Sequence, residues 1–410
     1  MSRFSLERVT IDGFRSLRQL TLDGLGAITL LVGANNSGKT SVLEALSILC
    51  NPEDPQEWLT MVRRRDFGGL DETRIQSLRW CFTQAGPLLA REPARSYLPP
   101  RYEGCCEMTC DGCFPLRKLA VNYRDILREP VERDTSGNGS TPAGPAIDVD
   151  FDEPDQGAEI SHTFDLCDGS TRGDSIESTS RTAAAPVTMQ FWENDPPTGR
   201  RPPPMGSAQL PCQVLTPYSY QINTRQVVKQ SQQLLSGAAA SKSARSQLLA
   251  LLALFDPEIV DIQIASFRGR RPAIYLSHLR LGVAPITVFG DGVRRAILLA
   301  NSLNMLQGGG LLLIDEVETG IHVSALQSVF SWLAKAAREL DVQIVATTHS
   351  LEAVDAISES VSDRMDDLVT FHLEQKAHQT IGKRFSGDLL RRIREERGFG
   401  RLLSEWPTSG

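Results

Sequence analysis

The chain has 410 residues, of which 41% are hydrophobic and 23% are charged, and its formal net charge at pH 7 is −7. This length accommodates one large domain or two ordinary ones, and the hydrophobic content argues against wholesale disorder. The acidic balance excludes a globally basic nucleic-acid binder, although it still allows a local basic groove.

The first segment, 4–32, is predicted to form short strands joined by turns. Apolar and polar residues alternate there, and Asp12-Gly13 and Asp23-Gly24 interrupt the alternation as turns do. The N-terminus shows no signal-peptide core, and the most apolar short run, 248–255, falls far below the roughly 20 residues that span a bilayer. We therefore expect a cytoplasmic protein that does not engage a membrane.

A glycine-bounded loop lies between an apolar strand, 28–32, and a helix predicted over 39–49. It matches the pattern G-x-x-x-x-G-K-[ST], in which backbone N–H groups and a helix N-terminus surround phosphates. Lys39 is predicted to place its charge on the β- and γ-phosphates of ATP, and Thr40 to offer a hydroxyl to Mg²⁺. The flanking strand and helix make a chance glycine-rich turn the weaker explanation. The predicted phosphate-site residues are Gly33, Asn35, Asn36, Ser37, Gly38, Lys39, Thr40 and Ser41.

The middle of the chain, 81–240, is predicted to be a β-rich and partly disordered insertion. Its stretch 134–211 is rich in Gly, Ser, Thr, Pro and Asp, a composition typical of long loops. Strand-like segments in or beside this insertion are 77–82, 119–122, 160–166 and 186–192.

Four of the eight cysteines cluster in the insertion: Cys105, Cys106, Cys110 and Cys113. The spacing of the last two has the shape of half a zinc site, so structural zinc held by the four thiols is one hypothesis. A second well-spaced CxxC is missing, which favours the alternative of reduced thiols in a β-hairpin.

Strands and helices alternate after residue 243, which implies a parallel sheet with helical crossovers. The apolar strand 311–314 ends in two acids that would face the ligand crevice at the carboxyl edge of such a sheet. Asp315 is predicted to hold Mg²⁺, and Glu316 to polarise the attacking water as a general base. The predicted elements are helices 243–254, 292–306 and 323–340 and strands 259–266, 273–277, 311–314 and 343–347.

Two further features fit the same layout. His349 follows the strand next to the acidic one, so it is expected in the same crevice, where it could contact the γ-phosphate. The glycine-flanked helix start at 290–292 is a second anion-site candidate, and an ordinary cap with Asp291 as the cap residue is the alternative. The Asn-Lys-x-Asp motif of GTPases is missing from the sequence, which favours ATP.

These motifs together resemble those of the ABC-type ATPases of the RecF/SMC/OLD group. The resemblance covers roughly residues 4–50 and 245–355. It implies an α/β P-loop NTPase with an ABC-type head, a mixed or parallel sheet flanked by helices, and a β-rich insertion. The domains would be an N-terminal ATPase lobe (1–80), the insertion (81–240) and a C-terminal ATPase lobe (241–410). The matching motifs are 11–17 (IDGFRSL), 33–41 (GANNSGKTS), 290–292 (GDG), 314–322 (IDEVETGIH) and 347–350 (TTHS).

The resemblance also implies a head-to-tail homodimer, or a higher homo-oligomer, with ATP held between protomers. Arg15 would contact the nucleotide, and His349 would sense the γ-phosphate. Many relatives have Ser where Gly290 stands, so contacts from this turn would use backbone N–H groups or Arg294. Gln84 is the candidate Q-loop residue. The residues expected to face the partner's P-loop are Gly290, Asp291, Gly292 and Arg294.

Too few residues follow His349 for the Toprim nuclease domain of OLD-type proteins, and no long heptad run indicates an SMC arm. The resemblance therefore implies an ATP-hydrolysing component of an antiviral defence system that controls a separate effector, a nuclease or a toxin. The alternative is a repair ATPase that clamps DNA directly. The basic run 383–401 is the candidate DNA surface, although its interleaved acids predict a solvated amphipathic helix.

Overall fold

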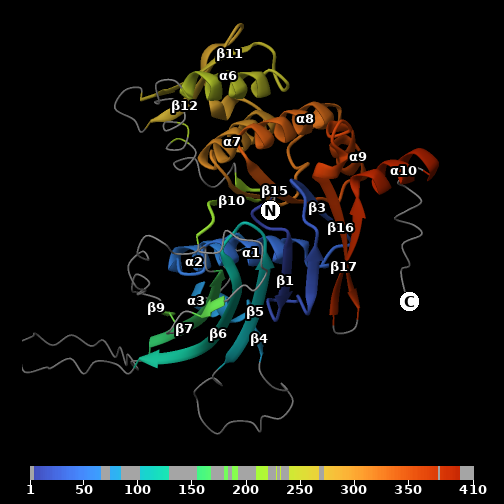
Figure 1. The fold of residues 1–410 in the computed structure, drawn as a ribbon. Helices are drawn as coiled ribbons and strands as arrows, with labels where there is room; N and C mark the ends of the chain where they lie inside the picture. Colours follow the sequence, from blue (N-terminus) through green and yellow to red (C-terminus); the bar gives the residue numbers. More distant parts are fainter. Residues whose placement is uncertain are drawn as a thin grey trace, which may run out of the picture.

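The computed structural model contains three sheets within the part of the chain that it describes (Figure 1). Six, eight and three strands form these sheets. The described residues are 4–65, 74–84, 102–128, 155–167, 180–182, 187–192, 209–219, 228, 231, 240–266, 272–376 and 379–397.

The six-stranded sheet is the centre of the fold. Its five neighbouring strands β10, β14, β15, β3 and β16 run parallel, and the edge strand β17 is antiparallel to β16. Every residue of β3, β14 and β15 is buried, as expected for strands covered on both faces. The bounds are β10 (Cys212–Leu215), β14 (Gly310–Ile314), β15 (Val342–Thr347), β3 (Ile28–Val32), β16 (Leu368–Lys376) and β17 (Gln379–Ser386).

Each face of the central sheet has its own hydrophobic core. Leu30 and Ile344 point into one core, which they share with α7 (Asp291–Met305), α8 (Val323–Glu339) and α9 (Leu351–Ser360). Leu31 and Val345 point into the other core, which contains α1 (Lys39–Cys50) and α2 (Pro55–Arg63). Neighbouring strand residues divide between the cores because successive side chains leave a strand on opposite faces.

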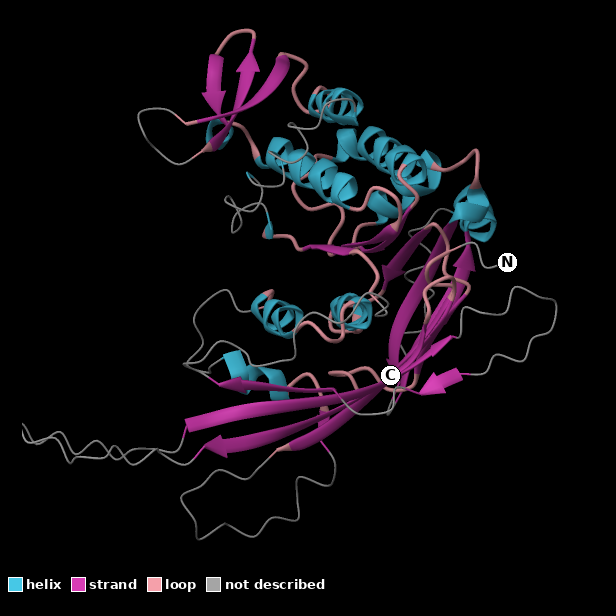
Figure 2. Cartoon of the chain, turned by 60° about the vertical axis from the view of Figure 1, so that its left-hand side comes forward, coloured by secondary structure: helices cyan, strands magenta, loops and turns pink. Residues whose placement is uncertain are grey.

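The eight-stranded sheet covers the far side of α1 and α2, so both helices lie between two sheets (Figure 2). Its main path is β2-β1-β5-β6-β7-β8, and β4 and β9 pair with β5 and β7. The bounds are β1 (Arg8–Asp12), β2 (Leu20–Asp23), β4 (Thr83–Gln84), β5 (Glu103–Asp111), β6 (Leu116–Arg128), β7 (Asp155–Cys167), β8 (Ser180–Thr182) and β9 (Val187–Trp192).

The three-stranded sheet sits beyond α7, together with α6 (Ala240–Leu252) (Figure 1). Ile262 and Leu276 anchor it in the core that contains α7. We call this sheet and α6 the upper lobe; the 3₁₀ turn η2 (Ile286–Val288) leads from it into α7. Its strands are β11 (Ile259–Ala265), β12 (Ala273–His278) and β13 (Gly282–Pro285).

Most of the predicted elements are present, within a few residues of their predicted bounds. The strand predicted over 77–82 is wrong, because 74–79 form the helix α3 (Arg74–Arg79). Leu78, Cys81 and Phe82 are buried while Trp80 is 54% exposed, a spacing that suits a helical turn and not an alternating strand.

The segment predicted as an insertion contains strands, as expected, and these extend the sheet of the N-terminal segment, since β5 pairs with β1. The disorder predicted there lies outside the described residues. Near the C-terminus, Lys383 and Arg384 belong to β17, and the helix α10 (Gly387–Arg397) begins only after them. A helix long and apolar enough to cross a membrane is not found among the described residues.

Candidate functional site

The phosphate-type loop turns sharply between β3 and α1. Gly33 has φ 147° and Gly38 has φ 94°, values that L side chains rarely adopt. A Cβ on Gly33 would lie 2.5 Å from the Leu373 carbonyl oxygen, and one on Gly38 would lie 2.7 Å from Leu17 Cδ2. Both positions therefore require glycine for backbone conformation and for close approach.

Lys39 lies inside this loop and is only 4% exposed. Its Nζ donates hydrogen bonds to the carbonyl oxygens of Gly33 and Ala34 at 2.9 and 2.8 Å. Burial lowers the pKa of Lys39, while the charges of Asp315, Glu316 and Glu318 act in the opposite direction. A buried cation at a helix N-terminus, inside a glycine cradle, is suited to an anionic phosphate chain.

The acidic pair lies beside the loop, as the sequence predicted. Thr40 Oγ1 donates to the Asp315 carboxylate at 3.1 and 3.2 Å, although 275 positions separate the two residues. Thr319 Oγ1 donates to Glu316 Oε2 at 3.1 Å. A hydroxyl and a carboxylate oxygen at this spacing are the hard ligands that Mg²⁺ prefers, so the residues fit this ion.

Two side chains that the sequence reasoning missed hold the acidic pair in place. Thr347 Oγ1 donates to Asp315 Oδ1 at 2.6 Å and accepts the Glu316 N–H at 2.8 Å. Arg295, fully buried on α7, donates to the carbonyl oxygens of Thr216 and Glu316 at 2.7 and 3.3 Å. The sequence did contain a signal for Arg295, because it is a charged residue on the apolar face of a predicted helix.

His349 follows β15, which pairs with β14, so it reaches the edge of the sheet where the acids lie. Its side chain is exposed, and its backbone N–H donates to Glu318 Oε1 at 3.1 Å. Glu318 Oε2 is buried and has no hydrogen-bond partner among the described residues. Glu318 is therefore a third acid of the site. It lies within the motif 314–322 that the sequence analysis identified, but no role was predicted for it.

Two residues predicted to contact nucleotide have other partners in the structure. Arg15 forms an ion pair with the buried Glu44 of α1 at 2.6 Å. Ser41 Oγ accepts a hydrogen bond from Arg65 at 3.1 Å, and Arg65 also pairs with Glu44 at 2.7 Å. These contacts brace α1 behind the loop, and the nucleotide contacts of Arg15 and Ser41 stay predictions.

Residues 290–294, which we call the signature-like turn, begin α7 on the face of the central sheet opposite α1. Gly290 is the N-cap residue of α7, and no side chain caps the helix. The alternative in which Asp291 is the cap residue is therefore wrong. Gly290 and Asp291 are exposed, and Arg294 pairs with Asp291 at 3.4 Å. The first N–H groups of α7 are thus not taken up by a side-chain cap.

The remaining P-loop residues, Asn35 and Asn36, are exposed, and Ser37 is buried with its Oγ 3.5 Å from Lys39 Nζ. The Q-loop candidate Gln84 is the last residue of β4. Its side chain lies outside what the structure describes, so this prediction stays open.

The zinc hypothesis for the cysteine cluster does not fit the geometry. Cys105 and Cys106 are neighbours on β5, so one is exposed and the other is buried on the opposite face. Cys110 Sγ lies 3.0 Å from the Leu116 carbonyl oxygen inside the core, whereas Cys113 is exposed in the turn between β5 and β6. Among the described residues, the cysteines form no group with metal-ligand spacing, and thiols in a β-hairpin describe them better.

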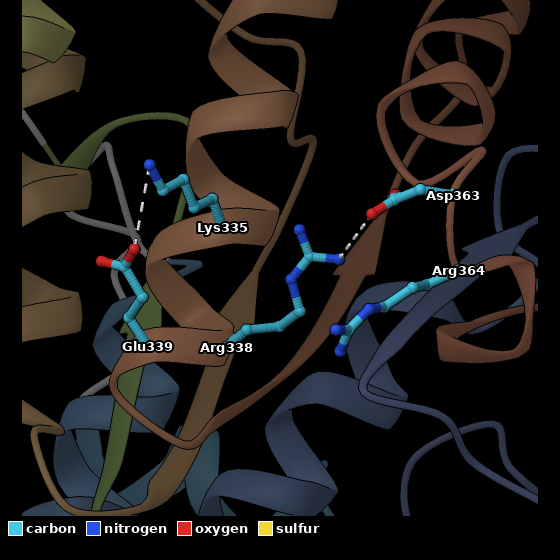
Figure 3. A pocket seen from close by; sticks show the side chains of 5 residues that line it. All are labelled: Lys335, Arg338, Glu339, Asp363 and Arg364. Carbon is cyan, nitrogen blue, oxygen red and sulfur yellow. Dashed lines mark ion pairs between the residues drawn. The ribbon is translucent and has the colours of Figure 1, made fainter.

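A charged groove lies away from this site (Figure 3). It is formed by the last turns of α8 and the segment after α9, and it contains no residue of the P-loop or of the acidic pair. Arg338 and Asp363 approach to 4.0 Å across it, and Lys335 and Glu339 to 3.9 Å along α8. Ion pairs at these distances near the surface add little to the stability of the fold. Since none of the lining residues belongs to the P-loop or the acidic pair, we do not assign the groove to the nucleotide site.

The fold and the site define a P-loop nucleotide-binding protein, and the comparisons with known proteins agree. Residues 5–84 match the family described as "AAA ATPase domain", and residues 221–355 match the family described as "AAA domain, putative AbiEii toxin, Type IV TA system". These two segments of the chain are therefore similar to AAA ATPase domains.

Individual relatives are similar over limited segments. An uncharacterised protein of Methanocaldococcus jannaschii is 30% identical over 109 residues, which is 27% of this chain and 95% of that protein. The DNA replication and repair protein RecF of Pseudomonas savastanoi is 53% identical over 45 residues, 11% of this chain and 12% of RecF. A solved Smc head domain derived from Pyrococcus furiosus aligns with 95% of this chain and 98% of its own, at 10% identity and a TM-score of 0.44.

Proposed function

We propose that this chain hydrolyses ATP at the site formed by the P-loop and the acidic pair. The carrying observation is the contact between Thr40 and Asp315, which brings the phosphate loop and the acidic strand end to one point. In this proposal Lys39 binds the β- and γ-phosphates, and Thr40 and Asp315 hold Mg²⁺. When bound, Mg²⁺ would offset the negative charge of the phosphates.

Glu316 is the proposed general base. Its backbone is fixed by Thr347 and its carboxylate by Thr319, so the second carboxylate oxygen is left to polarise a water molecule. His349 is the proposed sensor of the γ-phosphate. Its exposed ring, on a backbone held by Glu318, supports this role.

We further propose that the protein acts as a nucleotide-dependent homodimer or higher homo-oligomer. The signature-like turn and the P-loop helix lie on opposite faces of the central sheet. A nucleotide held between protomers would let the turn of one protomer complete the P-loop site of the other. The backbone N–H groups at the start of α7, which has no side-chain cap, are the proposed phosphate contacts.

The proposed biological role is the ATPase component of an antiviral defence system in the cytoplasm that controls a separate nuclease or toxin. The match over 221–355 supports only the toxin–antitoxin setting, because the description of that family names a putative toxin in the matched domain itself. We propose that the effector is a separate chain.

The second candidate is a DNA-binding repair ATPase. The RecF similarity favours it, although it covers only 12% of RecF. Lys383 of β17 and Arg391 and Arg392 of α10 are exposed, and their positive charges are the proposed contacts of a DNA backbone.

Mobility shifts of a DNA duplex, with and without ATP and at several salt concentrations, separate the two roles. The defence proposal expects no ATP-dependent shift with this chain alone. A strong shift that weakens steeply with salt would favour the repair ATPase instead.

A further inference from the structure

Three ligand-type side chains form a compact cluster in the upper lobe. The ligand atoms of Asp256, Glu258 and His278 all lie within 4.8 Å of one another. His278 Nε2 lies 3.2 Å from Asp256 Oδ2 and 3.4 Å from Glu258 Oε2, and its side chain is only 5% exposed. Residue types alone would suggest a divalent metal.

The hydrogen bonds of the His278 ring argue against a metal. Nδ1 accepts the backbone N–H groups of Arg280 and Leu281 at 3.1 and 3.2 Å. A nitrogen that accepts these bonds carries no proton, so the proton of the neutral ring is on Nε2. A metal at Nε2 would displace that proton and leave an imidazolate. Arg280 also already pairs with Glu258 at 2.5 Å.

The cluster is instead a hydrogen-bonded latch, which we call the His278 latch. Nε2–H donates to Asp256, so the latch joins the turn after α6 to the turn between β12 and β13. Two backbone bonds tighten the same junction: the N–H of Leu279 donates to the Glu258 carbonyl oxygen at 3.0 Å, and that of Ile259 donates to the Asp256 carbonyl oxygen at 3.2 Å.

Two phenyl rings connect the latch to the signature-like turn. Phe289 directly precedes Gly290, is buried, and has its ring centroid 5.9 Å from that of His278. Phe255 directly precedes Asp256, and its Cδ1 lies 2.6 Å from where a Cβ on Gly292 would be. Phe289 thus joins the turn to the His278 ring, and Phe255, the neighbour of Asp256, packs against Gly292 of the turn.

We propose that Phe255, His278 and Phe289 are positioning residues of the composite ATP site: they fix the turn 290–294 where it meets the nucleotide bound by a second protomer. This inference rests on the proposed function. None of the three needs to touch the nucleotide.

Accurate placement matters here because of how the turn would bind phosphate. Its cap residue is a glycine and no side chain caps the helix, so contacts must come largely from backbone N–H groups. Backbone donors cannot adjust as a long side chain can, and a shift of about 1 Å can lower a rate about a hundredfold. The two rings give the upper lobe direct packing contacts with the turn.

The test compares His278→Asn, Phe289→Leu and Phe255→Leu with Asp261→Asn in the full-length protein. The asparagine retains an acceptor for the Arg280 and Leu281 N–H groups but loses the donor to Asp256. The control breaks the ion pair of Asp261 with Arg245, which lies in the same lobe and is separate from the latch. The readouts are kcat and KM for ATP, affinity for a fluorescent ATP analogue, and ATP-dependent dimerisation in a Glu316→Gln background.

We expect the three variants to lose about tenfold or more in kcat, because the turn is misplaced. They should keep their affinity for the analogue within about twofold, because the P-loop is intact. They should also fail to dimerise, whereas Asp261→Asn behaves as the parent.

Turnover and dimerisation equal to the parent in all three variants would overturn the inference. A loss of analogue affinity that matches the loss of kcat would also overturn it, since it would indicate general unfolding. If His278→Asn does not fold, the two phenylalanine variants decide alone. A parent without ATP turnover, or a Glu316→Gln protein that stays monomeric with ATP, would instead refute the proposed function.

Discussion

The hydroxyl of Thr347 donates a hydrogen bond to Asp315 Oδ1 at 2.6 Å. The same oxygen accepts the N–H of Glu316 at 2.8 Å, so one side chain holds both Asp315 and Glu316. Glu316 has φ 47°, an uncommon backbone angle for a residue other than glycine. Such strain persists only where surrounding contacts enforce it, and Thr347 supplies one of them.

Replacing Thr347 by Val keeps the shape of the side chain and removes both hydrogen bonds. We expect the loss to destabilise the protein by about 1–3 kcal/mol, because the Glu316 N–H is left without its acceptor. ATP turnover should fall about tenfold or more as the acids lose their alignment. Phosphate release and urea unfolding measure the two effects. Thr347→Ser, which keeps the hydroxyl, should retain most of both; equal defects in the two variants would contradict this role.

Lys39→Ala should weaken ATP binding by about 30-fold or more, equivalent to about 2 kcal/mol or more for a buried charge contact. Titration with a fluorescent ATP analogue measures it. Lys39→Arg is the matched control for charge. A guanidinium is too broad for the cradle formed by the Gly33 and Ala34 carbonyl oxygens, so we expect it to bind poorly as well. Nucleotide affinity at the wild-type level in Lys39→Ala would remove Lys39 from the site.

Glu318 should be more important for turnover than for nucleotide binding. Its carboxylate accepts the His349 N–H, and its charge also acts on Lys39. Glu318→Gln keeps an acceptor for that bond, whereas Glu318→Ala does not. We therefore expect Glu318→Ala to lower kcat about tenfold and Glu318→Gln to lower it less. The prediction fails if the alanine variant hydrolyses ATP as fast as the glutamine variant.

Folding stability should decrease in mild acid because of His162. Its ring is 1% exposed, and burial lowers its pKa from 6.5 to about 4. The unfolded chain takes up this proton below about pH 6.5, while the folded chain resists until about pH 4. The stability linked to His162 is thus fully present above pH 6.5 and is lost as the pH falls toward 4.

Urea unfolding at pH 7 and pH 5 measures this effect before most carboxylates titrate. Between these values the wild type should lose about 2 kcal/mol more than His162→Leu, from about 1.4 kcal/mol per pH unit below the unfolded pKa. Parallel losses in both proteins would show that His162 does not carry the effect.

The sequence was sufficient for the local parts of the site. The loop 33–40 and the strand end at Asp315 are contiguous motifs, and their flanking β3, α1 and β14 follow from apolar patterning. The parallel order of β14 and β15 also followed from the crossover helix between them.

Contacts between distant segments could not be predicted in this way. The motif around Arg15 predicts a contact with nucleotide, whereas in the structure its guanidinium pairs with Glu44, 29 positions away. Thr347 and Arg295 gain their roles only when β15 and α7 meet the end of β14. A pattern within one segment can mark such a residue as unusual, as for Arg295, but it does not identify the distant groups that the side chain contacts.

The strand predicted over 77–82 is wrong because alternating apolar residues also occur at the end of a helix. Trp80 fits the alternation, but it is exposed directly after α3. At Cys105 and Cys106 the structure shows the alternation, because these adjacent strand residues face opposite sides of β5 and do not share a metal. The pairing of β5 with β1, in which Cys110 lies opposite Val9, spans about a hundred residues of sequence.

The central claim is that Glu316 activates the water that attacks ATP, and phosphate release from Glu316→Gln tests it most directly. We predict that the variant still binds ATP but hydrolyses it at least about a hundredfold more slowly than the wild type, because the amide cannot act as a base. Turnover of ATP at the wild-type rate by Glu316→Gln would contradict the assignment of the base and the mechanism built on it.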